Sequence, residues 1–287
     1  MRVVITGAGG LVGRALTEHC LLAGDEVFAF ERAALDIAHR EQVLEKISKA
    51  KPDAVLNCAA WTDVDGSESD PARAKAVNAD GSENLAWASR NAEAAFLTIS
   101  TDYVFDGVKE GFYTQRDDPN PLGVYAQSKL DGERRAQLAY ARTVVVRTGF
   151  IFGRGGKNFL STVVDRARRG EKVKAISDAW GTPTYAPDLA KRLRALVVRD
   201  IPGIFHVVSG GEGATYEEFA RVAVAQAGCS TTNIESVPFD SLKRPAPRPR
   251  SSKLRCLLSP ALGLAPLPTW QEGVKDFLQS LDQSVAG

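Results

Sequence analysis

The sequence predicts a doubly wound α/β fold, in which helices cover both faces of a parallel β-sheet. Strand-like and helix-like segments alternate through the first half of the 287-residue chain. The segment "DAVLN" at 53–57 is apolar almost throughout, as in strands that are buried on both faces. A glycine-rich bend joins the first strand to the first helix. These three observations together favour a parallel sheet that is covered by helices on both faces.

The expected elements of the first half follow in order. Apolar runs predict strands at Val3–Thr6, Glu26–Phe30, Ala54–Asn57, Ala95–Ser100 and Thr143–Arg147. Helical patterns lie between them at Leu11–Ala23, Arg40–Lys49, Pro71–Asn91 and Tyr125–Tyr140. Asp70 is a good start for the third of these helices, because its side chain can cap free N–H groups while Pro71 takes the first helical position.

The alternation is less regular after about residue 150. We expect helices at 158–170, 187–199 and 215–228 and from about Thr269, and a strand in "GIFHVVSG" at 203–210. The segment "RPAPRPRSS" at 244–252 cannot be helical, because proline removes a hydrogen-bond donor and clashes with the preceding turn. We therefore divide the chain into a nucleotide-binding domain at 1–150, to which later strands return, and a smaller, mainly substrate-binding lobe at 151–287.

Composition excludes several classes of function. The chain has 36 Lys and Arg against 35 Asp and Glu, so no basic surface for nucleic acid is expected. No apolar run is long enough to span a membrane and no signal peptide is evident, which predicts a cytoplasmic protein. The cysteines are far apart and the histidines isolated, so we predict no metal site, and a core role for His206.

The bend "VVITGAGGLVGRAL" at 3–16 places Gly7, Gly10 and Gly13 at three-residue spacing. Glycine tolerates positive φ and lets other backbone approach closely. The helix that follows offers free N–H groups and a partial positive charge to a diphosphate. The bend therefore suits the pyrophosphate of a dinucleotide, although an unliganded strand–helix turn has the same local pattern.

Two opposite charges follow the second strand, at Glu31 and Arg32. In a dinucleotide-binding fold this position lies near the adenosine ribose. Glu31 would accept hydrogen bonds from a free ribose and repel a 2′-phosphate, whereas Arg32 would do the opposite. The sequence therefore leaves NAD(H) and NADP(H) both open.

The candidate catalytic residues lie in two segments. In "PLGVYAQSKLDGE", Tyr125 and Lys129 are four residues apart and share one helix face. An ammonium near the phenol should lower the tyrosine pKa and help it exchange a proton with a carbonyl oxygen during hydride transfer. In "AAFLTISTDYVFDG", a strand delivers Thr101 and Asp102 at its carboxyl end, where Thr101 could bond the same oxygen. A capped strand end and a solvated lysine are the structural alternatives.

The motifs "TGAGGLVG", "NCAAWTDVDGSE", "STDYVF", "YAQSK", "GTPTYAPDLA" and "RPRSSKL" together resemble the extended short-chain dehydrogenase/reductase superfamily. Within it, the chain resembles the dTDP-4-dehydrorhamnose reductase branch. The resemblance covers nearly the whole chain. "STDYVF" and "GTPTYAPDLA" are the motifs that indicate the branch, whereas the glycine bend and YxxxK are common to the superfamily.

This resemblance implies a Rossmann-type sheet and assigns residues to three roles. The cofactor would be held at its pyrophosphate by Gly7, Gly10, Leu11, Val12 and Gly13, beside its adenine by Asp36 and Ile37, and along the cleft by Ala59, Ala60, Trp61 and Thr62. The catalytic set would be Thr101, Tyr125 and Lys129, of which the last two also face the cofactor. The substrate would contact Thr101, Asp102, Phe150 and Arg248, with the guanidinium of Arg248 suited to a diphosphate.

Two departures from the branch concern the sugar. Phe150 stands where the branch usually has a tryptophan, which keeps an apolar wall but loses the indole N–H. Leu258 stands where the branch has a lysine. Both changes affect the identity of the sugar more than the type of reaction.

The expected function is NAD(P)H-dependent reduction of the 4-keto group of a nucleoside-diphosphate deoxysugar, chiefly dTDP-4-dehydro-L-rhamnose to dTDP-L-rhamnose. The partner would be this small sugar nucleotide, with no nucleic acid or membrane, and a homodimer is compatible with the sequence. One alternative is a reductase for another 4-keto sugar nucleotide. The other is a non-catalytic NADP-binding regulatory subunit, similar to the β subunit of methionine adenosyltransferase.

Overall fold

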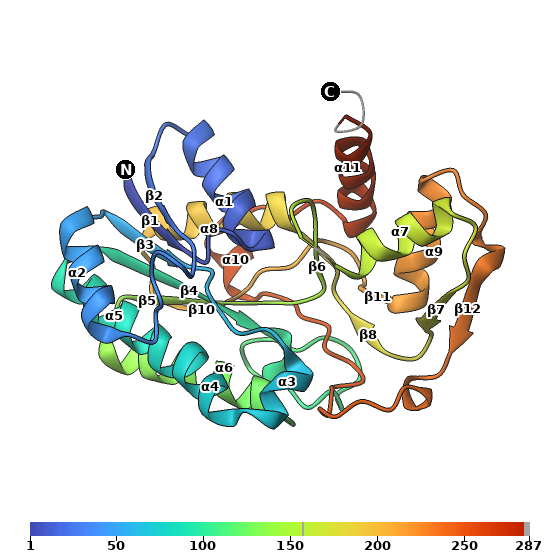
Figure 1. Cartoon of the computed structure of the whole chain (residues 1–287), viewed down its shortest axis with the longest axis horizontal. Helices are drawn as coiled ribbons and strands as arrows, with labels where there is room; N and C mark the ends of the chain where they lie inside the picture. The colour runs from blue at the N-terminus through green and yellow to red at the C-terminus, as the bar shows by residue number, and fades with distance from the viewer. Residues whose placement is uncertain (157, 284–287) are drawn as a thin grey trace.

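The structure is a computed structural model that describes residues 1–156 and 158–283. Its centre is a six-stranded sheet in the order β10-β5-β4-β3-β1-β2, with every neighbouring pair parallel (Figure 1). The strands are β1 (Arg2–Thr6), β2 (Glu26–Phe30), β3 (Ala54–Asn57), β4 (Ala95–Thr101), β5 (Thr143–Thr148) and β10 (Gly203–His206). From β1 the chain adds β2 on one side and then β3, β4, β5 and β10 on the other, so the order of the strands reverses between β1 and β3. The crevice at the carboxyl ends of these two strands is the expected place for a ligand.

Helices cover both faces of this sheet, which confirms the predicted fold class. On one face lie α1 (Leu11–Leu22) and α8 (Ala186–Arg199), and on the other α2 (Arg40–Ala50), α5 (Gly81–Asn91) and α6 (Val124–Ala139). Successive strand residues point to opposite faces. Accordingly Val3 and Ile5 pack under the first helix pair, while Val4 packs under the second set. Burial on both faces explains the continuous apolar strands in the sequence.

The helix expected at Pro71–Asn91 is interrupted by a π-turn. It consists of α4 (Pro71–Lys75), a π-helical segment η1 (Ala76–Asp80) and α5, and Asp70 caps its start as expected, by accepting a hydrogen bond from Arg73 N at 3.0 Å. A short unpredicted helix, α3 (Val64–Ser69), precedes it. The expected helix is therefore present over its predicted bounds, and it contains a π-turn that leaves no trace in the apolar pattern.

The lobe beside the sheet is built from the second half of the chain (Figure 1). Its helices are α7 (Phe159–Arg168), α9 (Tyr216–Gln226) and α11 (Trp270–Gln283), with the short α10 (Leu258–Ala261) nearer the sheet. Three two-stranded pairs complete it: β7 (Val173–Ile176) with β12 (Ile234–Val237), β6 (Ile151–Phe152) with β9 (Thr184–Tyr185), and β8 (Trp180–Gly181) with β11 (Ala214–Thr215). Because α8 and β10 also come from this half, the division at residue 150 stays a prediction.

Residues 244–255, here called the linking segment, run from the lobe back to the sheet. Within it, Arg250 O accepts a hydrogen bond from Trp180 N, and Ser252 N donates to Trp180 O, both at 2.8 Å. Tyr113 N donates to Lys253 O at 2.7 Å. The proline-rich part is not helical, as expected. In the part of the chain that the structure describes, no helix is long and apolar enough to cross a membrane.

Candidate active site

The glycine bend has the geometry of a phosphate cradle. Gly7 has a φ of +67°, and a Cβ there would lie 2.6 Å from Ala59 N. A Cβ on Gly13 would lie 2.2 Å from Gly7 O, which no side chain could tolerate. The first helix begins directly after Gly10, which has no side chain to cap it, so its first N–H groups face outward. A diphosphate fits this arrangement.

A cavity of about 390 Å³ adjoins the bend and collects most of the predicted cofactor residues. Its lining includes Gly7, Gly10, Glu31, Arg32, Asp36, Ile37, Ala59, Ala60 and Trp61, together with Gly9, Leu35, Cys58 and Val77, which the sequence did not single out. Leu11, Val12 and Gly13 follow the bend in the first turn of α1, and neither they nor Thr62 line this cavity. The apolar walls and the glycine cradle fit an NAD(P) molecule, so these roles stay our proposal for its site.

The two charges after β2 both reach this cavity. Glu31 lies against the bend, since a Cβ on Gly9 would be 3.0 Å from its Cδ. Arg32 stands 4.0 Å from Asp36 in an exposed ion pair, NH2 to Oδ2. The structure therefore keeps opposite charges beside the ribose position, and both cofactors remain open.

The predicted catalytic residues are brought together beside the carboxyl end of β4. Thr101 is the last residue of β4, and Tyr125 and Lys129 occupy the first two turns of α6. The side chains of all three residues are buried. The Thr101 hydroxyl donates to Asp102 Oδ1 at 3.1 Å and accepts from Tyr103 N at 3.2 Å. The Tyr103 ring meets Tyr125 edge-on, with 6.3 Å between ring centroids. The set is therefore compact and shielded from water.

One electrostatic expectation was wrong. Burial raises the pKa of Tyr125 well above its ordinary value, while the hydrogen bond with the Thr101 hydroxyl acts in the opposite direction. Instead the Lys129 amine donates to Ile99 O at 2.7 Å, and burial lowers its pKa to about 8. The sequence could not show that the fold buries Tyr125 and Lys129 so completely that desolvation has the largest effect on both pKa values.

Asp102 connects the strand end to the linking segment. Its Oδ2 accepts from Ser252 Oγ at 2.5 Å and its Oδ1 accepts from Thr101. Burial raises the pKa of this carboxyl group to about 6. Because both oxygens are already bonded, Asp102 positions Thr101, and its contact with a substrate stays a prediction.

The other two predicted substrate residues lie where the lobe meets the sheet. Phe150 stacks on Tyr216 with 4.3 Å between centroids, and a Cβ on Gly181 would be 2.4 Å from its ring. Arg248 is 13% exposed and its guanidinium holds Asp65 through two bonds, of 3.0 and 2.9 Å. An acidic side chain of α3 thus already binds this guanidinium, and its contact with a diphosphate stays a prediction.

Asn78 is a site residue that the sequence analysis missed. Its amide accepts from Trp61 N at 2.8 Å and donates to Trp61 O at 3.1 Å and to Ser128 Oγ at 3.0 Å. It lies in the π-helical segment, and a Cβ on Gly132 would be 2.2 Å from its carbonyl oxygen. Asn78 thus fixes the cavity wall to α6, and π-turns often mark such functional positions.

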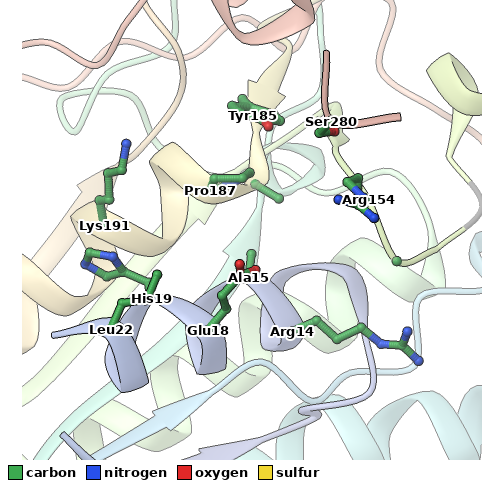
Figure 2. A pocket seen from close by; sticks show the side chains of 12 residues that line it. Arg14, Ala15, Glu18, His19, Leu22, Arg154, Tyr185, Pro187, Lys191 and Ser280 are labelled. Atoms are coloured by element: carbon green, nitrogen blue, oxygen red, sulfur yellow. The ribbon is translucent and has the colours of Figure 1, made fainter. Parts of the chain in front are cut away.

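A second and larger cavity, of about 650 Å³, lies between α1 and α8. Figure 2 shows His19 and Lys191 along one side of it and Arg154 near Ser280 on another. None of the predicted cofactor, catalytic or substrate residues lines it. His206 lies elsewhere, buried in the sheet with Nδ1 beside two backbone carbonyls. The described residues hold no group of three or more potential metal ligands.

Comparisons with known proteins agree on one family. The family described as the RmlD substrate binding domain matches residues 1–283. The chain is 36% identical over 283 residues to the dTDP-4-dehydrorhamnose reductase of Mycolicibacterium smegmatis, covering 98% of this chain and 86% of that protein. It is 33% identical to a dTDP-4-keto-6-deoxy-D-glucose reductase of Streptomyces niveus, with 94% and 93% covered. A crystal structure of the Bacillus anthracis dTDP-4-dehydrorhamnose reductase with NADP superposes with a TM-score of 0.93 at 30% identity, covering 97% and 98%.

Proposed function

The chain belongs to the RmlD substrate binding domain family, and from this we propose that it is a dTDP-4-dehydrorhamnose reductase. It is an NAD(P)H-dependent oxidoreductase that reduces the 4-keto group of dTDP-4-dehydro-L-rhamnose to give dTDP-L-rhamnose. The observation that carries the proposal is the buried set of Thr101, Tyr125 and Lys129, which is connected to the cavity at the glycine bend through Cys58 of the cavity lining, whose thiol acts on the Lys129 amine. A regulatory nucleotide-binding subunit would not need this set.

The bend and the cavity hold the cofactor in this proposal. The N–H groups at the start of α1 bind the pyrophosphate, Ile37 and Asp36 border the adenine, and Ala59 to Trp61 form the cavity wall. When bound, NAD(P)H supplies the hydride that adds to C4 of the sugar.

Tyr125 is the proton donor. Its raised pKa keeps the phenol protonated at neutral pH, so its hydroxyl can give a proton to O4 as the carbonyl becomes an alkoxide. Thr101 donates a hydrogen bond to the same oxygen and stabilises its growing charge. The Lys129 ammonium, which donates to Ile99 O in the structure, would orient the nicotinamide ribose and would have to turn toward Tyr125 to stabilise the phenolate left there. Solvent then returns a proton to the phenolate.

The lobe and the linking segment supply the sugar-nucleotide side. We assign the sugar wall to Phe150 and the neighbourhood of the diphosphate to Arg248, which would have to share its guanidinium with Asp65. We further propose that the protein acts in the cytoplasm on a free sugar nucleotide. This role needs neither nucleic acid nor a membrane, and it is compatible with a homodimer.

A reductase for a different 4-keto sugar nucleotide is the second candidate. It is favoured by Phe150 in place of the tryptophan of the branch and by the similarity to the Streptomyces niveus enzyme, whose name specifies a different sugar. The chemistry assigned to Thr101, Tyr125 and Lys129 would be the same for both substrates.

The test follows oxidation of NADPH and NADH with dTDP-4-dehydro-L-rhamnose. Turnover should fall by about 10²-fold or more in Tyr125→Phe, because the proton donor is lost. Tyr140→Phe is the matched control, since Tyr140 follows the other end of α6 and removal of its hydroxyl leaves the predicted catalytic set untouched. Unchanged turnover in Tyr125→Phe would overturn the assignment. Cofactor binding without turnover of any 4-keto sugar nucleotide would favour the regulatory subunit.

A further inference from the structure

A buried ion pair lies one helical turn beyond Lys129. Glu133 in α6 is 2% exposed and Arg147 in β5 is 3% exposed. Arg147 Nε donates to the two carboxylate oxygens at 3.0 and 3.2 Å, and its NH2 donates to Oε2 at 2.7 Å. Two charges inside a core are costly unless their geometry is excellent, and apolar residues often serve stability as well. Stability alone therefore does not account for the pair.

The pair and the Lys129 amine occupy the same layer between α6 and the sheet. Lys129 and Glu133 are four residues apart, so they lie on one face of the helix. The Lys129 amine donates to Ile99 O in β4 at 2.7 Å. Arg147 pairs in register with Ser100, the residue after Ile99. The three charged groups thus form a row beside the end of β4.

Glu133 supplies the main negative charge in the surroundings of Lys129. Cys58, which follows β3, also acts on the amine, but burial raises the pKa of its thiol to about 12, so it is neutral at neutral pH. Tyr125 on the same helix is protonated for the same reason. Asp102, at the end of β4, is bonded to Ser252 and Thr101. Burial lowers the pKa of Lys129 to about 8, and Glu133 is the first of the groups that oppose this.

We propose that Glu133, fixed by Arg147, is a positioning residue that keeps the Lys129 amine charged in its buried site. Arg147 binds both carboxylate oxygens, so Glu133 acts on Lys129 through its charge and leaves the amine directed at the strand end. The inference rests on the proposed function, because only there does the charge of Lys129 serve Tyr125 and the cofactor ribose.

The first experiment measures the Lys129 pKa directly, by NMR titration of protein labelled with ¹³C at lysine Cε. The signal is assigned by its absence in Lys129→Met. Glu133→Gln should lower the pKa of Lys129, and Glu133→Asp, which keeps the charge, should largely restore it. Asp131→Asn is the matched control: it removes the same charge two residues earlier, where the carboxylate bonds the exposed Gln127 instead. This readout requires neither cofactor nor sugar, so it stands if the proposed substrate is wrong.

The second experiment compares kcat/KM across pH. Lowering the Lys129 pKa from about 8 to about 7 would cut its charged fraction about fivefold at pH 8 and hardly change it at pH 6. Glu133→Gln should therefore lose about fivefold at pH 8 only, while Asp131→Asn follows the parent protein. A loss of equal size at every pH, or an unmoved Lys129 signal, would overturn the proposal. If Glu133→Gln does not fold, Glu133→Gln/Arg147→Met leaves no unpaired buried charge; its Lys129 pKa should still fall, by less than in Glu133→Gln because the positive charge of Arg147 is removed as well, and an unmoved signal there would also overturn the proposal.

Discussion

Replacing Asn78 by alanine should loosen the cofactor cavity from a position outside it. The Asn78 side chain is buried in the π-helical segment and makes three hydrogen bonds, two to the backbone of Trp61 and one to Ser128. Trp61 lines the cavity, whereas Asn78 does not. The substitution removes these bonds and leaves the Trp61 N–H without its acceptor.

The size of the effect follows from the bond count. At about 1 kcal/mol for each hydrogen bond, Asn78→Ala should lose about 3 kcal/mol of unfolding free energy. For a chain of this length that corresponds to a fall in Tm of about 6 °C. If about 1 kcal/mol of this reflects the freed Trp61 backbone, the Kd for NADH or NADPH should rise about fivefold.

Thermal unfolding and cofactor titration by fluorescence measure the two quantities separately. Thr143→Val is the control, because the buried Thr143 hydroxyl bonds Ala136 O and Tyr140 O at the other end of β5. That variant should lose stability and keep the parent Kd. A Kd within twofold of the parent in Asn78→Ala, despite a lowered Tm, would refute the argument that Asn78 holds the cavity wall. Equal weakening in both variants would refute it as well.

Two further predictions test the sugar wall and the buried histidine. In Gly181→Ala the new Cβ would lie 2.4 Å from the Phe150 ring and displace it. The KM for the sugar nucleotide should therefore rise about tenfold while the cofactor Kd stays unchanged. An equal loss of cofactor affinity would contradict this prediction. Burial lowers the pKa of His206 from 6.5 to about 4. Between these pH values the unfolded chain binds a proton that the folded protein does not, so the free energy of unfolding should fall by about 3 kcal/mol as the pH falls from 6.5 to 4. In urea unfolding His206→Gln should lack this loss, and an identical pH dependence in both proteins would contradict the assignment.

The sheet was predictable from sequence because its information is local. Every expected strand of the first half exists within a residue or two of its predicted bounds. A central strand that is buried on both faces, such as β3, has to be apolar almost throughout, whereas the edge strand β2 is only partly buried. The lobe was less predictable. In the pairs β6–β9 and β8–β11 each strand has two residues, which is too short to show an alternating apolar pattern. The strands β7 and β12 pair although about 60 residues separate them in the chain.

The site divides in the same way. The glycine bend was readable because Gly7 and Gly13 cannot carry a side chain: a Cβ on Gly7 would meet the backbone of Cys58 and Ala59 after β3, and one on Gly13 would meet Gly7 O. The bonds from Arg248 to Asp65 and from Ser252 to Asp102 join residues 183 and 150 positions apart, which no local pattern encodes. The raised pKa of Tyr125 depends on how completely the fold buries it, so spacing alone gave the wrong direction.

These long-range bonds explain why the linking segment matters for chemistry as well as for sugar binding. Ser252 bonds Asp102 Oδ2, and the other oxygen of that carboxylate accepts the Thr101 hydroxyl. The Thr101 hydroxyl, which we assign to the substrate carbonyl, is therefore connected to Ser252 of the linking segment through two hydrogen bonds. In the proposed mechanism a sugar oxygen would take the place of Asp102 as the partner of Thr101, so the carboxylate would lose one of its two side-chain donors and keep Ser252. Movement of the linking segment would thus change how readily Thr101 turns to the substrate.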